Sequence, residues 1–208
     1  CEVEVTEKHK QAEVLEFGHT FYTSLNSNYY MVSYAAKIRN PNSTYELMSP
    51  GVDITIQGVS GNILKTDYSL MNHLAPGDTS YVVGTAYVEK SSGQIGEVTF
   101  SNHILSDWAF FDRDDSRYLN SNNYLISQSS EIPGMNEYKY TGRVSRTATA
   151  RDLYTPSAAV LFRKNGVLVG GGTCVLGSDG QGAFEISVDK DQIDAMGAGY
   201  AYSFAVIN

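Results

Sequence analysis

The sequence has few cysteines and no long apolar run. Its two cysteines, Cys1 and Cys174, stand near opposite ends of the 208-residue chain and make a poor disulfide pair. No histidine follows Cys174 to act as a base, so we expect a small buried apolar side chain on a strand rather than a nucleophile. Since no run reaches about 18 apolar residues, the sequence predicts no membrane-spanning helix.

Basic side chains and histidines are also scarce. The chain has 15 Lys and Arg against 23 Asp and Glu, a net charge of −8. An acidic chain is repelled by phosphate backbones, and the sequence holds no basic run, so we expect no nucleic-acid partner. The histidines do not stand at the spacing of a zinc site, and we therefore predict no metal and no cofactor. These histidines are His9, His19, His73 and His103.

Motifs that carry catalysis or metal binding are missing or incomplete. Gly58-Val-Ser-Gly61 lacks the spacing of a nucleophile elbow and is typical of a hairpin turn. Asp112-x-Asp114-x-Ser116 begins like a calcium loop, but Arg117 takes the place of the turn glycine. Gly170-Gly-Gly172 has no following lysine, so it indicates a bulge or a close backbone approach. We predict that the chain is not an enzyme; an enzyme with an unrecognised site is the least favoured alternative.

What the sequence does contain points to β-structure. It has 15 Tyr, 8 Phe and 19 Gly, and apolar residues alternate with polar ones in several segments. One alternation runs from Tyr29 to Ile38, and another starts after Pro50 and runs through Val52 to Ile56. Turn residues recur about every 8 to 12 residues, a pattern typical of an antiparallel sandwich.

One segment of the chain recurs. The stretch from Tyr34 to Asn62 returns from Tyr140 onward, and Pro50 falls on Pro156, 106 residues later. By this offset Trp108 to Phe111 matches Glu2 to Val5, so we expect the aromatic cluster to begin a second unit. The predicted domains are residues 1–106 and 107–208, joined by a short, stiff connection.

The motifs of both copies resemble a known family. A strand, a polar turn, an alternating strand with a hairpin glycine, and Leu-x-Pro-Gly-x-Thr before an aromatic strand are similar to the FxLYD-type domain of bacterial and archaeal surface proteins and lipoproteins. The matching residues are Ile54-Thr-Ile56, Gly61, Leu74-Ala-Pro-Gly-Asp-Thr79 and Tyr81 in the first copy, and Val160-Leu-Phe162 and Gly166 in the second. Gln57-Gly58 stands where the family has Tyr-Asp. The resemblance implies an all-β chain of two tandem antiparallel immunoglobulin-like β-sandwiches, without an active site.

Cys1 carries a prediction about location. A chain that starts at cysteine is what remains when bacterial lipoprotein signal peptidase cuts before the residue to be acylated; the alternative is a trimmed boundary. The first interpretation predicts lipidation of Cys1. The protein would then be extracytoplasmic, at the bacterial cell surface or in the periplasm, with the lipid as its contact with the membrane.

Aromatic residues near loops and near the expected junction supply the candidate binding site. Aromatic rings offer flat apolar faces that suit sugars or partner proteins, although a Tyr-rich sandwich also needs aromatics in its core. We therefore predict an interaction or adhesion module for an unknown protein or glycan at the cell surface, with a passive envelope spacer as the alternative. The predicted contact residues are Trp108, Phe110, Tyr118 and Tyr124; Tyr22 and Tyr29 also lie in or beside loops.

Overall fold

The computed structural model describes residues 8–24, 26–112, 123–147, 156–177 and 180–207. The described residues lie mostly in antiparallel strands, which confirms the all-β prediction. None of the helices within these ranges is long and apolar enough to cross a membrane. Cys1, Tyr118 and the calcium-like residues Asp114 and Ser116 lie outside the described residues.

The N-terminal half contains two stacked three-stranded sheets, ordered β1-β2-β7 and β5-β4-β8. Alternate residues of the central strands β2 and β4, such as Val32 and Ile54, point into one buried core between the sheets. A small third sheet, β6-β3-β9, extends this half. The elements are β1 (Glu13–Tyr22), β2 (Tyr29–Arg39), β3 (Tyr45–Met48), β4 (Gly51–Gly58), β5 (Ile63–Leu70), β6 (His73–Leu74), β7 (Thr79–Glu89), η1 (Lys90–Ser92), β8 (Ile95–Asn102), η2 (Asp107–Ala109) and β9 (Phe110–Asp112).

The C-terminal half repeats this strand order. Its sheets are β10-β11-β14 and β13-β12-β15, and a second core lies between them, with Tyr140 and Phe162 fully buried. The predicted Asn165-Gly166 hairpin is present, and both residues have the positive φ angles, 52° and 81°, that such turns need. The elements are β10 (Tyr124–Pro133), β11 (Glu137–Arg146), β12 (Ser157–Lys164), β13 (Val167–Val175), β14 (Gly182–Asp189), α1 (Lys190–Met196) and β15 (Tyr200–Ile207).

Matching backbone hydrogen bonds show which residues of the halves correspond. The Pro50 carbonyl accepts from Met71 N–H at 2.9 Å, and the Pro156 carbonyl accepts from the backbone N–H of residue 176 at 2.8 Å. At the other end of the sheets, Lys90 N–H donates to Asn28 and Lys190 N–H to Asn136. The offset is therefore 106 at the prolines but 108 at the asparagines. The predicted match of Tyr34 with Tyr140 is wrong by two residues, because the segment from Asn136 to Pro156 is two residues shorter than the segment from Asn28 to Pro50.

By this register Tyr34 corresponds to Gly142. The aromatic residue and the glycine of one cross-strand pair have therefore exchanged strands between the two halves. Tyr34 lies opposite Gly84 across β2 and β7, and Gly142 lies opposite Phe184 across β11 and β14. A Cβ on Gly84 would lie 2.4 Å from the Tyr34 hydroxyl, and one on Gly142 would lie 2.6 Å from the Phe184 ring. In both halves an aromatic ring thus covers a cross-strand glycine, but the strand that carries the ring differs.

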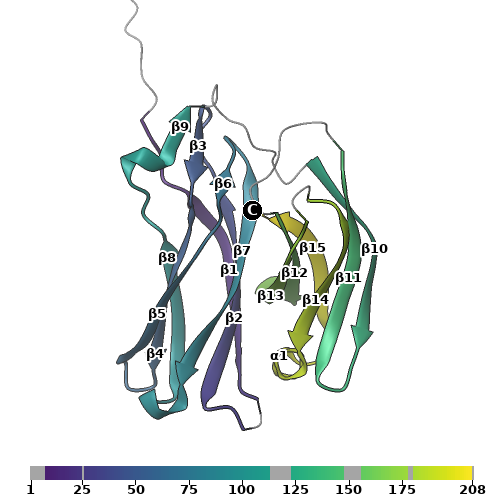
Figure 1. Cartoon of the computed structure of the whole chain (residues 1–208). Helices are drawn as coiled ribbons and strands as arrows, with labels where there is room; N and C mark the ends of the chain where they lie inside the picture. The colour runs from purple at the N-terminus through teal and green to yellow at the C-terminus, as the bar shows by residue number, and fades with distance from the viewer. Residues whose placement is uncertain (1–7, 25, 113–122, 148–155, 178–179, 208) are drawn as a thin grey trace, which may run out of the picture.

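The inner sheets of the two halves, β1-β2-β7 and β13-β12-β15, pack against each other. In Figure 1 they lie between the outer sheets β5-β4-β8 and β10-β11-β14. Strand β13 lies on β1, β2 and β7, and Leu168 joins Ala35 and Leu161 in a small buried cluster at this joint. The backbones approach closely: a Cβ on Gly18 would lie 1.5 Å from the Leu168 carbonyl oxygen. The close approach predicted for the triple glycine is confirmed, because Gly171 lies so near Val83 that a side chain at position 171 would clash with it.

Polar groups complete the joint between the halves. The buried Ser33 hydroxyl donates to the Gly171 carbonyl at 3.1 Å and accepts from the Gln192 amide at 2.8 Å. Arg163 Nη2 donates to Glu16 Oε2 at 2.8 Å, and the Leu168 N–H donates to Glu16 Oε1 at 3.0 Å. The hydrogen bond with Arg163 lowers the pKa of Glu16. The buried pair Ser33 and Gln192 and the partly exposed pair Glu16 and Arg163 are all hydrogen-bonded across the joint, which favours one arrangement of the two halves.

The aromatic segment after β8 pairs with the N-terminal half. Phe110 lies opposite Leu47 in the pairing of β9 with β3, and its ring packs against the N-terminal core. The predicted boundary after residue 106 thus separates Phe110 from the strand with which it pairs. β9 pairs with the edge of β3 that lies away from β6. Residue spacing along the chain does not reveal this pairing between distant segments.

Candidate functional site

The predicted contact residues that the structure describes do not form one surface. Trp108 is 67% exposed in η2, whereas Phe110 is partly buried and stacks on His9 with ring centroids 4.6 Å apart. Tyr124 is only 7% exposed and belongs to the C-terminal core. It begins β10 with its ring turned inward, where a Cβ on Gly180 would lie 3.0 Å from that ring. The prediction that Tyr124 is a surface contact is therefore wrong.

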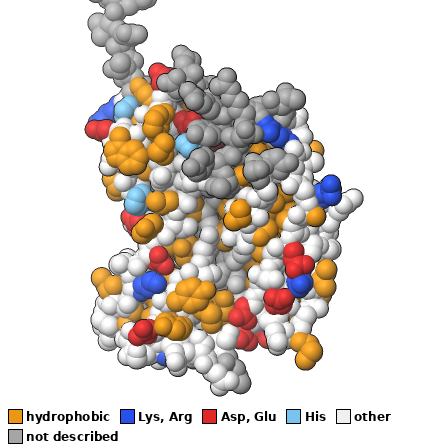
Figure 2. Space-filling model, in the orientation of Figure 1, with side chains coloured by type: hydrophobic (Ala, Val, Ile, Leu, Met, Phe, Trp, Pro, Cys, Tyr) orange, Lys and Arg blue, Asp and Glu red, His pale blue; other side chains and the backbone are white. Residues whose placement is uncertain are grey.

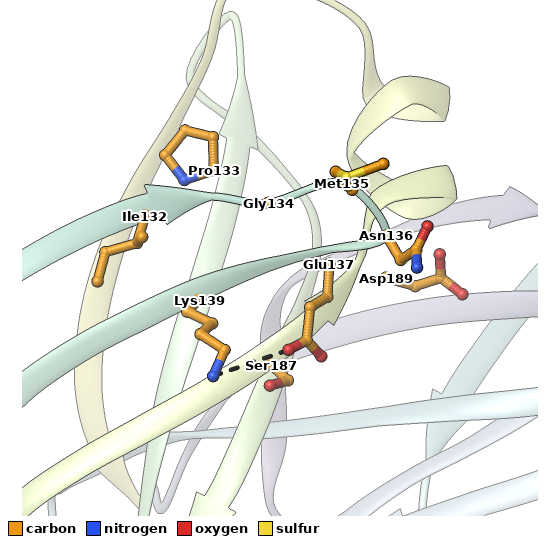
Figure 3. Close-up of a pocket in the computed structure, with 9 residues that line it drawn as sticks. All are labelled: Ile132, Pro133, Gly134, Met135, Asn136, Glu137, Lys139, Ser187 and Asp189. Carbon is orange, nitrogen blue, oxygen red and sulfur yellow. Dashed lines mark ion pairs between the residues drawn. The ribbon is translucent and has the colours of Figure 1, made fainter.

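A better candidate lies at the opposite end of the molecule from β9. The β10–β11 hairpin, the β1–β2 turn and α1 meet at the lower end of Figure 1. There a hollow of about 760 Å³ opens beneath the hairpin on the outer face of the β10-β11-β14 sheet. Figure 3 shows its lining: Ile132, Pro133, Gly134, Met135, Asn136, Glu137, Lys139, Ser187 and Asp189.

The local sequence builds this hairpin from turn residues. Pro133 ends β10, and a Cβ on Gly134 would lie 2.5 Å from the Glu137 carbonyl oxygen, so the tight turn requires glycine. Met135 follows at the tip with 92% of its surface exposed, and Ile132 is 49% exposed. Exposed apolar side chains at a hairpin tip contribute nothing to the core. They are available for contact with another molecule.

Hydrogen bonds join the hairpin to the start of α1, and join the end of β14 to the N-terminal half. The N–H of Lys190, at the start of α1, donates to the Asn136 carbonyl at 3.0 Å. The Asp189 carboxylate caps α1 by accepting from Asp191 N–H at 2.9 Å, and it also accepts from the Ser24 hydroxyl of the N-terminal half at 3.0 Å. The hollow therefore has a rigid floor.

The charges in the hollow are unbalanced. Glu137 and Asp189 are cross-strand partners on β11 and β14, but their side chains point apart: Figure 3 shows Glu137 turned toward Lys139 and Asp189 turned away from it. Lys139 donates to Glu185 at 2.7 Å and lies 3.8 Å from Glu137, and the hydrogen bond with Glu185 raises the pKa of Lys139. Lys139 thus pairs with two carboxylates, whereas the Asp189 carboxylate is held by Asp191 N–H and by Ser24. Figure 2 shows acidic side chains beside basic and hydrophobic ones over the lower part of this half.

The N-terminal half has a smaller hollow at the corresponding place. It measures about 360 Å³ and is lined by Asn28, Tyr29, Glu89, Lys90 and Ser91. Its Tyr29 lies opposite Glu89, in the position that Glu137 and Asp189 occupy in the C-terminal half. Tyr29 and Tyr87 make an edge-to-face contact at 6.5 Å. The same backbone thus presents an aromatic surface in one half and an acidic, apolar surface in the other.

The described part of the chain contains no group of three or more His, Cys, Asp or Glu side chains placed to hold a metal ion. Two histidines lie beside single carboxylates: His103 Nδ1 is 2.8 Å from Asp53, and His73 Nδ1 is 3.0 Å from Glu46. Cys174 is on a strand, as predicted, but its side chain is only partly buried; this burial raises the pKa of its thiol.

Compared with known proteins, the chain matches no family model and no curated protein. The FxLYD resemblance therefore stays a prediction. Sequence reasoning missed the hairpin hollow, although Pro133-Gly-Met-Asn136 is a turn signal with an apolar residue at its tip. The opposition of Glu137 and Asp189 had no sequence signal, because it depends on the register of strands that are far apart in the chain.

Proposed function

We propose that this protein is a non-catalytic, extracytoplasmic interaction module that binds a protein partner at the β10–β11 hairpin hollow. One observation carries the proposal: Met135 and Ile132 stand exposed beside a hollow of about 760 Å³ whose floor is a hydrogen-bonded sheet. A rigid floor with an exposed apolar anchor lowers the ordering cost of binding. The extracytoplasmic setting follows from the FxLYD resemblance.

The joint between the halves supports this proposal. The hollow lies in the C-terminal half, but Ser24 of the N-terminal half bonds to Asp189 in its lining. The buried contacts of Ser33 with Gly171 and Gln192 join the two halves. A partner would therefore meet one fixed surface, as expected for an interaction module.

The test is affinity capture of partners from the cell envelope with the full chain and two variants. Met135→Ser removes the apolar anchor, and Ile104→Ser is the matched control, because Ile104 is 70% exposed in the loop after β8. We expect Met135→Ser to weaken capture of a specific partner about 5-fold or more and Ile104→Ser to leave it unchanged. Equal capture by both variants would contradict the proposal.

A passive envelope spacer is the second candidate, and the rigid joint itself favours it. A spacer must hold a fixed distance between its ends, which the joint around Leu168 and Ala35 would ensure. The two candidates differ in one outcome. For a spacer, Met135→Ser has no effect in cells, whereas a change that loosens the joint abolishes function; for an interaction module, both changes impair it.

A further inference from the structure

One edge of the C-terminal inner sheet lacks the features that usually keep another strand away. Within the described residues β15 pairs only with β12, and this pairing has no bulge. Its eight residues include no charged residue and no proline. The other edge strands of the stacked sheets in both halves each contain a charged residue or a β-bulge. Because proteins protect free edges by these means, a long uncharged edge indicates a place that another strand covers.

The free edge of β15 opens into a groove between neighbouring sheets. This edge groove measures about 330 Å³ and is lined by residues 79–81 of β7, 124–126 of β10 and 204–206 of β15. Strands β7 and β10 are themselves edge strands, both contact β15, and β15 lies between them in Figure 1. Three sheet edges therefore meet at one groove, and two of them form walls on either side of β15.

The N-terminal half shows what fills the corresponding position. Phe17 of β1 corresponds to Ile126 of β10, since they pair with positions 36 and 144. Phe100 of β8 corresponds to Phe204 of β15, since they pair with positions 54 and 160. The Phe17 and Phe100 rings stack with centroids 4.1 Å apart, whereas Ile126 and Phe204 line the groove. The groove thus lies where the N-terminal half holds an aromatic ring.

Both walls of the groove offer apolar surface to an added strand. Phe204 belongs to the C-terminal core, and its ring makes edge-to-face contacts with Phe184 and Tyr202 at 5.4 and 5.7 Å. Ala205 faces the other way and packs with Tyr81 in the joint between the halves. Successive side chains of a strand point to opposite faces. A strand beside β15 would therefore place one face against Phe204 and the other against Tyr81.

We infer that the edge groove binds an extended peptide segment of another protein, which adds to the sheet β13-β12-β15 as a fourth strand and places an aromatic side chain beside Phe204. Main-chain hydrogen bonds to β15 supply affinity, and the aromatic side chain supplies specificity. The groove shares no lining residue with the hairpin hollow, so it is a second surface beyond the proposed function.

The occupant is a single strand from another molecule. Every described strand of this chain already belongs to a sheet. The β15 edge of a second copy is flanked by β7 and β10 in the same way, so two copies meet wall against wall before their β15 edges can pair. A single extended segment has no such walls.

Fluorescence anisotropy with the full chain and the labelled, capped peptide Thr-Val-Thr-Phe-Thr-Val-Thr tests this inference. The peptide is uncharged, so a general attraction to the acidic chain does not contribute. Two further peptides carry N-methyl groups on either the odd or the even residues. Because a strand directs only alternate N–H groups to one neighbour, one methylated peptide should bind at least about 10-fold more weakly and the other within about 2-fold of the parent. Equal binding of both, or no binding of the parent peptide, would overturn the inference.

The aromatic contact is tested separately. A peptide with Ser in place of Phe should bind about 5-fold more weakly, since it leaves the position beside Phe204 without a ring. Ile126→Phe supplies from β10 the ring that the N-terminal half has at Phe17. It should fill the groove and weaken binding of the parent peptide at least about 5-fold. Unchanged binding in both experiments would contradict the aromatic contact and overturn the inference.

A second variant locates the peptide without changing the core. Leu125 lines the groove and is 58% exposed, so Leu125→Ser should leave the fold intact and weaken binding about 2- to 5-fold. Leu15→Ser is the matched control, because Leu15 is 48% exposed on the edge strand β1 and lies outside the groove. Equal losses in the two variants would overturn the inference.

Other occupants and other sites give distinct results. A peptide that loses binding with Met135→Ser and keeps it with Ile126→Phe binds at the hairpin hollow, which overturns the inference and leaves the proposed function in place. Analytical ultracentrifugation of the full chain alone tests for a second copy. A dimer that Leu125→Ser dissociates would place a second copy in the groove and overturn the inference.

Discussion

The two hairpin hollows share a backbone and differ in chemistry. Asn28 and Asn136 accept the same hydrogen bond from the lysine that follows β7 or β14, yet the residue after each asparagine is Tyr29 in one half and Glu137 in the other. The difference shows that the repeat determines where a surface forms, while individual side chains determine what it can bind. The shared backbone places Tyr29 opposite one carboxylate and Glu137 opposite another.

The comparison assumes that the two halves form one body, and Gly18→Val tests this with the largest expected effect. A Cβ at Gly18 would lie 1.5 Å from the Leu168 carbonyl oxygen, so the inner sheets must separate. We expect the free energy of unfolding to fall by about 3 kcal/mol, as measured by urea denaturation. Gly77→Ala is the control: it meets no atom within 4 Å at φ +74° and should cost about 1 kcal/mol. Equal losses would mean that the joint is loose.

A smaller effect is expected from the ion pair that connects the halves. Glu16→Gln should lower the free energy of unfolding at pH 7 by about 1 kcal/mol, because the pair with Arg163 is partly exposed and screened. The folded pKa of Glu16 lies below the ordinary 4.5, so this stabilisation is fully present above about pH 4.5 and is lost as pH falls through the lowered pKa.

Urea denaturation at several pH values measures this dependence. The difference between the parent chain and Glu16→Gln should disappear at low pH. Glu13→Gln in the same strand is the control; its pair with Arg39 is about half exposed and lies within one sheet. A difference that persists unchanged below the lowered pKa would show that packing, not charge, accounts for the effect of Glu16.

Exchanging the two residues that distinguish the hollows should have the smallest effect on stability. Glu137→Tyr replaces the acidic cross-strand partner of Asp189 by an aromatic residue and should raise the free energy of unfolding by about 0.5 kcal/mol, while Tyr29→Glu places an acidic residue opposite Glu89 and should lower it by a similar amount. Thermal unfolding at low and high salt measures both changes. The gain from Glu137→Tyr should shrink at high salt; a salt-independent gain would point to aromatic packing instead.

Much of the strand pattern was predictable from local signals. The alternation from Tyr29 to Ile38 became β2, and Asn165-Gly166 became a hairpin because both residues adopt positive φ readily. The triple glycine at 170–172 was predicted to allow close approach, and it lies against Ser33 and Val83. In each case the local residue type limits the backbone directly.

The candidate site was less predictable, for reasons that particular residues make clear. Tyr124 was expected at the surface because it adjoins a loop, but the start of β10 turns its ring into the core. Trp108 is exposed, yet η2, which carries it, leads directly into β9, and Figure 1 shows β9 at the opposite end of the molecule from the β10–β11 hairpin. Loop residues near one another in sequence share a surface only when strand pairing brings them to the same end.

The sequence by itself determined the β class, the recurring strand order and the turns, because alternation, proline and glycine act over a few residues. Only the tertiary structure decided that Glu137 is the cross-strand partner of Asp189, that Gly18 meets Leu168 and that the aromatic segment returns to β3. These contacts join residues distant in the chain. They depend on strand register and on sheet packing, which minimise the energy of the whole molecule rather than of any one segment.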